Sequence, residues 1–281
     1  MQICFEGLRL TEPSPKMDSD ERHIQVMMSE GRSVSQDSIH EAFPGATGSG
    51  VRVAVIDSGV NPNHPHIQGL AGGIAIGMET GMNSYVDFLG HGTAVLAAIQ
   101  EKAPKAAFYA IKIYYRSLRT DINFLIAALN WAIGEGVDVI NLSLGTANPA
   151  HFDRMIPIVQ KANDAGVLLV SAAEIDSVPL LPGSLPGVIG VGVDWTCPRN
   201  EFRKNPSGRV PRWLASGYPR SLPGVEPSDN LRGVSFSVAN MSGFVARAFE
   251  KTKRRSPGEI CMVLQNEAER LSSIEHQREN V

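Results

Sequence analysis

The stretch that decides the fold is Val51-Arg52-Val53-Ala54-Val55-Ile56-Asp57-Ser58-Gly59, an apolar run that ends on a carboxylate and a glycine. Most of its positions are β-branched or otherwise apolar, which predicts a strand buried on both faces. Such strands belong to parallel sheets that are covered by helices. Open parallel sheets carry their sites at the carboxyl ends of strands, so Asp57 is a candidate site residue. Taken alone, Asp57 is equally well explained as a cap of the following turn.

Other apolar runs alternate with segments of helical periodicity along the rest of the chain. We expect strands over 51–56, 107–113, 137–143, 167–172 and 188–193. We expect helices over 121–134, 152–165 and 235–251, and a last helix that begins at Ser256 or Pro257. This alternation predicts an α/β fold of three layers, with helices on both faces of a mostly parallel central sheet. Residues 195–232 are rich in Pro, Gly, Arg and Ser, and are expected to form a loop-dominated excursion.

The composition excludes several classes of protein. The 281 residues are 43% hydrophobic and 20% charged with a net charge of −3, which is typical of a globular protein. The sequence has no cluster of basic residues that would favour binding to nucleic acid, and no apolar run is long enough for a membrane span. The N-terminus has no recognisable secretory signal, so a cytoplasmic protein without nucleic-acid or membrane partners is expected. Three distant cysteines (Cys4, Cys197 and Cys261) fit neither a disulfide framework nor a zinc site.

Two further segments complement Asp57. Gly90-His91-Gly92-Thr93 precedes an apolar helical segment, and the flanking glycines let His91 approach other groups closely, as a general base requires. Gly233-Val234-Ser235 opens another helix, whose first N–H groups can stabilise a developing negative charge. Each residue also has a purely structural explanation, a buried histidine in one case and a helix N-cap in the other. Together, Asp, His and Ser supply an orienting carboxylate, a base and a nucleophile.

These segments resemble the motifs of the subtilase family of serine proteases. Asp57-Ser58-Gly59 resembles D-[ST]-G, His91-Gly92-Thr93 resembles H-G-T, and Gly233-Val234-Ser235 resembles the start of G-T-S-M-A. The resemblance covers about residues 45–270 and implies a three-layer subtilisin-like fold. It divides the chain into an N-terminal extension at 1–44, with no recognisable signal or full prodomain, and a subtilisin-like peptidase domain at 45–281.

The resemblance implies a serine endopeptidase that hydrolyses peptide bonds by an Asp-His-Ser mechanism. In it, Ser235 attacks the carbonyl, His91 transfers the proton and Asp57 orients His91. No cofactor and no metal are expected, because the calcium loops of the family are not recognisable. His64 and His66 are expected to be turn or surface histidines.

A connecting segment indicates how a substrate binds. Val139-Ile140-Asn141-Leu142-Ser143-Leu144-Gly145 resembles the V-I-N-M-S-L-G run of the family. The resemblance implies that the backbone of Ser143, Leu144 and Gly145 pairs with an extended peptide or protein substrate. Such strand addition supplies affinity through main-chain hydrogen bonds and leaves specificity to side-chain pockets.

The sequence departs from the family where the oxyanion is held. The family usually has A-A-G-N, whose Asn donates to the oxyanion, whereas this chain has Ala172-Ala173-Glu174-Ile175-Asp176. A gapless alignment puts Ile175, which cannot donate, at the Asn position. A shift of one residue puts Asp176 there, as the oxyanion candidate. A carboxyl group donates only when protonated, so Asp176 would need burial or a neighbouring carboxylate such as Glu174 to raise its pKa.

Three functions remain open at this point. The first is a subtilisin-like endopeptidase that selectively processes an intracellular peptide or protein precursor. The second is a catalytically weak or inactive subtilase scaffold that binds an extended peptide. The third is a protease that needs a partner chain to become active, since ordering a segment is a common regulatory device.

Overall fold

The structure is a computed structural model that describes residues 2–4, 41–77, 85–226, 229–252 and 256–279. In this part of the chain the central sheet contains β2 (Arg52–Asp57), β3 (Gly72–Ala75), β4 (Ala107–Lys112), β6 (Val139–Leu142), β7 (Leu168–Ala172), β10 (Ile189–Val193), β11 (Phe202–Lys204) and β12 (Trp213–Ala215). Their order across the sheet is β11-β12-β10-β7-β6-β2-β4-β3. Neighbouring strands run parallel except β11 and β12, which are antiparallel at one edge. The predicted parallel sheet is therefore confirmed.

The excursion over 195–232 contains more regular structure than the sequence indicated. Its strands β11 and β12 extend the sheet beyond β10. Each has only three residues, so neither is long enough to produce a clear alternating pattern. Two small antiparallel pairs lie outside the central sheet, β1 (Gln2–Cys4) with β5 (Arg119–Asp121) and β8 (Glu174–Ile175) with β9 (Val178–Pro179). Most of the predicted N-terminal extension, residues 5–40, lies outside the described residues.

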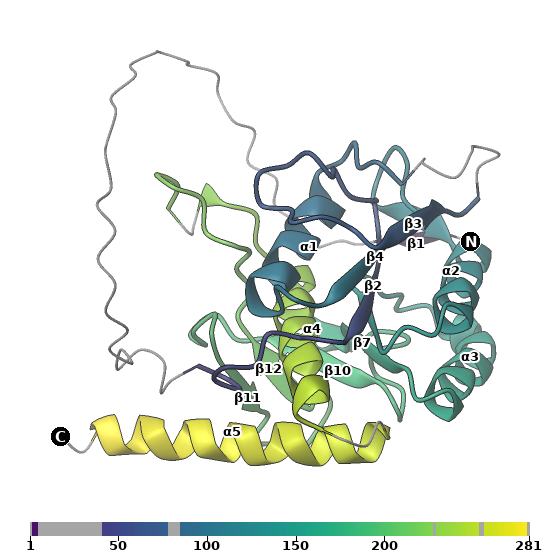
Figure 1. The fold of residues 1–281 in the computed structure, drawn as a ribbon. Coiled ribbons are helices and arrows are strands. Elements are labelled where there is room, and N and C mark those ends of the chain that lie inside the picture. Colours follow the sequence, from purple (N-terminus) through teal and green to yellow (C-terminus); the bar gives the residue numbers. More distant parts are fainter. Residues whose placement is uncertain (1, 5–40, 78–84, 227–228, 253–255, 280–281) are drawn as a thin grey trace, which may run out of the picture.

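Helices cover both faces of the sheet (Figure 1). They are α1 (His91–Lys102), α2 (Ile122–Gly134), α3 (Phe152–Asp164), α4 (Val234–Lys251) and α5 (Pro257–Glu279). Alternate residues of β2 enter separate cores: Val53 and Val55 pack with α1 and α4, whereas Ala54 and Ile56 pack with α2 and α3. The three layers are thus confirmed, and β2 is buried on both faces as its sequence predicts. No helix in the described part of the chain is both long enough and apolar enough to span a membrane.

The position of β2 decides where a site can form. From β2 the sheet continues through β4 to β3 on one side, and later parts of the chain add β6 and β7 on the other. Strands added after β2 thus lie first on one side of it and then on the other, so β2 borders the point at which the strand order of the sheet reverses. Ligand sites of open α/β sheets lie in the crevice at such a point, beyond the carboxyl ends of the strands. Asp57 is the last residue of β2 and stands at that end.

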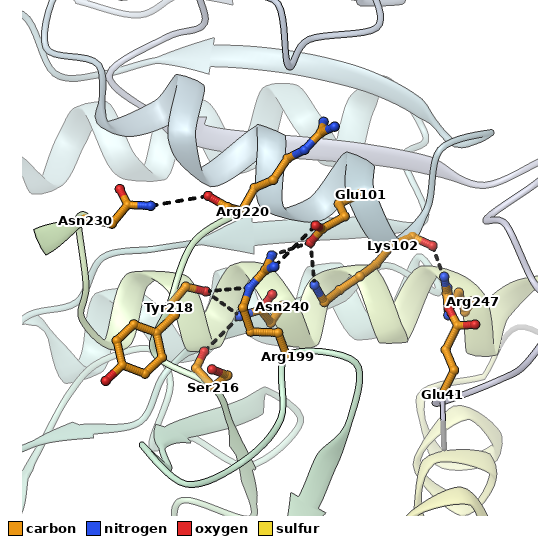
Figure 2. A network of polar contacts seen from close by, with 10 residues as sticks. All are labelled: Glu41, Glu101, Lys102, Arg199, Ser216, Tyr218, Arg220, Asn230, Asn240 and Arg247. Atoms are coloured by element: carbon orange, nitrogen blue, oxygen red, sulfur yellow. Dashed lines mark hydrogen bonds and ion pairs between the residues drawn. The ribbon is translucent and has the colours of Figure 1, made fainter. Parts of the chain in front are cut away.

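A polar network joins α1, α4 and the loops around them (Figure 2). Lys102, the last residue of α1, is buried, and its Nζ donates to Oε2 of Glu101 at 3.2 Å. The Arg199 guanidinium binds the same carboxylate. Arg247 of α4 donates to the Lys102 carbonyl and to the Glu41 carboxylate. Burial, followed by the charge of Arg199, lowers the pKa of Lys102 to about 8, although Glu101 acts in the opposite direction.

We predict that Lys102 makes the folded state more stable as pH rises. An unfolded chain keeps the lysine pKa near its ordinary value of about 10.4, so between about pH 8 and 10.4 only the unfolded state holds this proton. Lys102→Met should remove this contribution. The free energy of unfolding of the wild type, relative to Lys102→Met, should rise across that window by on the order of 3 kcal/mol in urea titrations.

The matched control for this prediction is Lys105→Met, which changes an exposed lysine just after α1. Its pH dependence should follow that of the wild type. A wild-type curve that stays parallel to the curve of Lys102→Met would contradict the prediction.

Candidate active site

The site is built on one short hydrogen bond between two buried side chains. Asp57 is 0% exposed and His91, the first residue of α1, is 4% exposed. Oδ1 of Asp57 lies 2.7 Å from Nδ1 of His91. The Ser58 N–H donates to the same Oδ1 at 2.7 Å, and the Gly92 N–H donates to Oγ of Ser58 at 2.9 Å. These backbone bonds join the end of β2 to the start of α1, so they fix the pair.

The surroundings favour the charged form of His91. Burial by itself lowers the pKa of His91, but the charge and hydrogen bond of Asp57 and the charge of Asp87 raise it above its ordinary value of 6.5. Nε2 of His91 is buried and has no hydrogen-bond partner among the described residues. Nδ1 is engaged by Asp57, so Nε2 is the ring atom that can exchange a proton with a reacting group.

Asp87 is a second carboxylate that the sequence analysis missed. Its Oδ1 accepts hydrogen bonds from the N–H groups of Leu89 and Gly90 at 2.8 and 2.9 Å. Its Oδ2 accepts from N and Oγ1 of Thr93 at 3.0 and 2.7 Å. The carboxylate therefore caps the first turn of α1 and holds the loop before His91. The available signal was an acid shortly before a helix start, which is typical of a capping residue.

Ser235 lies in the first turn of α4 and is 0% exposed. Its Oγ donates to the Ser143 carbonyl at 3.4 Å, while Oγ of Ser143 donates to the Ser235 carbonyl at 3.0 Å. The ring of Phe236, the next residue, has its centroid 6.1 Å from that of His91. The sequence-predicted residues Asp57, His91 and Ser235 thus come from distant segments to one region of the molecule.

The segment that follows β6 is anchored beneath α4. Nδ2 of Asn141 donates to Oγ of Ser143 at 3.0 Å, and Oγ of Ser242 donates to Oδ1 of Asn141 at 2.9 Å. Leu144 is buried, and its carbonyl accepts from Oγ of Ser171 at 3.2 Å. The predicted substrate-binding residues Ser143, Leu144 and Gly145 are therefore held next to Ser235. Their pairing with a peptide stays a prediction.

The structure does not supply the burial that the prediction for Asp176 requires. Asp176 and Ser177 form the two-residue turn between β8 and β9, with φ of 50° and 65°, and both are exposed. A cavity of about 290 Å³ is lined by Ile175, Asp176 and Val234, so this turn does lie beside the start of α4. The burial that would favour a protonated, donating carboxyl group is therefore not present at this turn, and the role of Asp176 at the oxyanion stays a prediction. Ile175 has no donor, which leaves the Ser235 N–H at the first turn of α4.

The structure also bears on the predictions for metal ions and cysteines. Within the described ranges, no group of three or more His, Cys, Asp or Glu side chains could hold a metal ion, and the absence of a metal requirement stays a prediction. Cys197 and Cys261 are free. Burial raises the pKa of the Cys197 thiol to about 12, so this thiol is unreactive near neutral pH.

Comparisons with known proteins agree with this geometry. The model described as the Subtilase family matches residues 48–280. The chain belongs to the subtilase family. Subtilisin E of Bacillus subtilis (strain 168) is 34% identical over 213 residues, which cover 70% of this chain and 52% of that relative. Subtilisin BL of Lederbergia lenta is 30% identical over 241 residues, which cover 82% of this subtilase and 87% of the relative. This subtilase thus spans about half the length of subtilisin E.

We predict that Gly92→Ala separates α1 from β2. A Cβ atom at position 92 would lie 2.2 Å from the Gly59 carbonyl oxygen and 3.1 Å from Cβ of Asp57, so the backbone must shift. The variant should lose several degrees of Tm, and the hydrogen-bonded Nδ1 proton of His91 should disappear from the downfield region of the NMR spectrum.

Gly134→Ala is the matched control, because a Cβ atom there meets nothing within 4 Å. Gly134 ends α2 and is exposed, so this change should leave Tm unchanged or raise it slightly. A Gly92→Ala protein with the Tm and NMR spectrum of the wild type would refute the predicted clash.

Asp87→Asn should lower the pKa of His91. The substitution removes a negative charge that favours the imidazolium, so His91 should lose its proton at a lower pH than in the wild type. An NMR titration of the imidazole Cε1 proton, assigned with His91→Gln, measures this change. Asp153→Asn, an exposed residue in the first turn of α3, should leave the titration where it is. An unchanged or higher pKa in Asp87→Asn would show that its charge does not act on His91.

Proposed function

We propose that this protein is a serine endopeptidase of the subtilisin type that hydrolyses peptide bonds. The observation that carries the proposal is the buried 2.7 Å hydrogen bond between Asp57 and His91. Ser235 lies in the first turn of α4, next to Phe236, whose ring centroid is 6.1 Å from that of His91. An orienting carboxylate, a base and a hydroxyl are the groups that acyl transfer requires. Membership of the subtilase family and the relatives named as subtilisins support the proposal of a serine endopeptidase.

In the proposed reaction, Oγ of Ser235 attacks the carbonyl carbon of the scissile peptide bond. Nε2 of His91 takes the hydroxyl proton and then delivers it to the leaving amine. A water molecule, activated in turn by His91, releases the acyl group from Ser235. Asp57 accepts the hydrogen bond from Nδ1–H and stabilises the imidazolium that forms. Oγ of Ser235 must first turn from the Ser143 carbonyl toward His91, a change of one side-chain rotamer.

The oxyanion is stabilised chiefly by the start of α4. The N–H of Ser235 belongs to the first turn, whose N–H groups lack intrahelical acceptors and lie at the positive end of the helix dipole. Ile175 offers no side-chain donor. Loss of one oxyanion donor lowers turnover on the order of 10²–10³-fold, so the proposed enzyme is slow unless its substrate supplies other interactions.

The substrate we propose is an extended peptide or protein segment that pairs with the backbone of Ser143, Leu144 and Gly145. Selective processing of a peptide or protein precursor fits an enzyme that depends on contacts beyond the scissile bond. The cytoplasmic location of this processing stays a prediction.

Two observations favour a second candidate function, a weak or inactive scaffold that binds an extended peptide or needs a partner chain. Ser235 is 0% exposed, and its hydroxyl donates to Ser143 rather than to His91. Such a scaffold would bind a peptide along the same backbone of Ser143, Leu144 and Gly145. It would differ from an active protease in that the Ser235 hydroxyl would not turn toward His91.

We predict that a fluorophosphonate labels Ser235 stoichiometrically. Intact-mass spectrometry should show one adduct on the wild type and none on Ser235→Ala. Ser237→Ala is the matched control, since Ser237 is also buried in α4 and should not be needed for labelling. Hydrolysis of internally quenched peptides by Ser235→Ala should fall by more than about 10³-fold.

Equal labelling of Ser235→Ala and the wild type would rule out Ser235 as the nucleophile. An unlabelled wild type would favour the second candidate, and labelling that returns with a partner chain would identify the activated form.

A further inference from the structure

A cavity of about 500 Å³ lies beside His91 and has no part in the chemistry proposed above. Its walls include Gly90 and Thr93, which flank His91 in the chain, and Leu231, which precedes the start of α4. Exposed apolar side chains stand at its mouth, among them Phe88, which is 80% exposed. A concave, largely apolar site with a few polar groups is the usual form of a ligand pocket.

Arg220 brings a positive charge to this cavity. One guanidinium N–H donates to the His66 carbonyl at 3.3 Å, and the Arg220 carbonyl accepts from Nδ2 of Asn230 at 3.3 Å. Figure 2 shows no contact between the Arg220 side chain and the Glu101 carboxylate, which binds Arg199 and Lys102. Among the described residues, no carboxylate lies within ion-pair distance of Arg220. A guanidinium has five N–H donors in a planar fork that matches a carboxylate, so most of its capacity is available.

His64 and His66 add polar groups to the same wall. Their rings meet edge to face with centroids 5.2 Å apart, and Nδ1 of His64 accepts from the His66 N–H at 3.2 Å. Burial, followed by the charges of Arg220 and His64, lowers the pKa of His66 below 6.5, against a smaller opposite effect of Glu101. At neutral pH His66 is therefore uncharged.

The one carboxylate among these lining residues does not bind Arg220. Asp87 lines the cavity, but its two oxygens already accept four hydrogen bonds from Leu89, Gly90 and Thr93. Its charge also raises the pKa of Lys112, which burial lowers, so a nearby cation balances it. Arg220 is left as the charged group of the wall that a ligand can bind.

We propose that this cavity binds an acidic side chain of the substrate on the leaving-group side, through its carboxylate and Arg220. The proposal rests on the proposed function, in which His91 gives its proton to the leaving amine. Residues after the scissile bond must therefore pass His91, where Gly90 and Thr93 form the wall. An extended peptide advances about 3.3 Å per residue. Because the wall of the cavity begins at Gly90, next to His91, we place the acidic residue among the first three after the cut.

The test uses an internally quenched decapeptide mixture randomised at its six central positions, with cleavage sites read by mass spectrometry. Wild-type products should be enriched in Asp or Glu, on the order of 10-fold over Asn or Gln, at one of the first three positions after the cut. Arg220→Gln should abolish the enrichment, whereas Arg220→Lys should keep part of it because a point charge remains. Arg209→Gln, an exposed arginine in the turn before β12, is the matched control and should retain the full enrichment.

A wild type without acidic enrichment, or enrichment that persists in Arg220→Gln, would overturn the proposal. A binding experiment separates this failure from a failure of the proposed function. Immobilised Ser235→Ala captures peptides from the same mixture, and those bound should be enriched in acidic residues that Ser235→Ala/Arg220→Gln no longer selects. If acidic peptides are captured but the wild type cleaves none of them, the proposed pocket is supported and the proposed protease activity is rejected. Capture without acidic preference would reject the pocket.

Discussion

The buried pair of Asp57 and His91 is the constraint on which the rest of the site depends. Removing a carboxylate and an imidazole from water is costly unless both are hydrogen-bonded, so the surrounding backbone must supply partners. The Ser58 N–H supplies one such partner to Asp57, and the Gly92 N–H donates to the Ser58 hydroxyl, which joins the end of β2 to the start of α1. Asp87 then holds the loop that delivers His91. A small Gly92 is required because α1 and β2 meet without room for a side chain.

The site also depends on α4, a helix with several polar residues that is buried in the apolar core. Helix α4 is buried over nearly its whole length, although it contains serines, an asparagine and an arginine. These residues are accommodated because most of their polar atoms bind neighbouring elements: Asn240 donates to the Ser216 and Tyr218 carbonyls at 2.8 and 3.0 Å. Ser242 reaches Asn141 in the same way. Buried polar contacts of this kind fix the position of a helix more sharply than apolar packing alone, and Ser235 is positioned through them.

The sequence predicted those features that depend on local pattern. Strands buried on both faces are long apolar runs, and Asp57, His91 and Ser235 stand in motifs that resemble those of a known family. The features it missed depend on contacts between distant segments. Asp87 is recognisable only once its oxygens meet the start of α1, and Arg220 only once the absence of a carboxylate partner is known for the described residues. The exposure of Asp176 depends on the two-residue turn between β8 and β9, which the sequence analysis did not foresee, and its role at the oxyanion stays a prediction.

The groups proposed for proton transfer and those proposed for oxyanion stabilisation differ in number, and this difference affects the proposed activity. In the proposed mechanism the groups for proton transfer are all present, since Asp57 and Asp87 raise the pKa of His91 and Nε2 has no partner among the described residues. The oxyanion site lacks a side-chain donor at Ile175. Binding energy from remote parts of a substrate can replace missing stabilisation at the reacting centre, but only if it is realised in the transition state. Main-chain pairing at Ser143 and a carboxylate on Arg220 would supply that energy from both sides of the scissile bond. A substrate without these contacts would gain little, so the proposed mechanism implies an enzyme that is selective for substrates that make them.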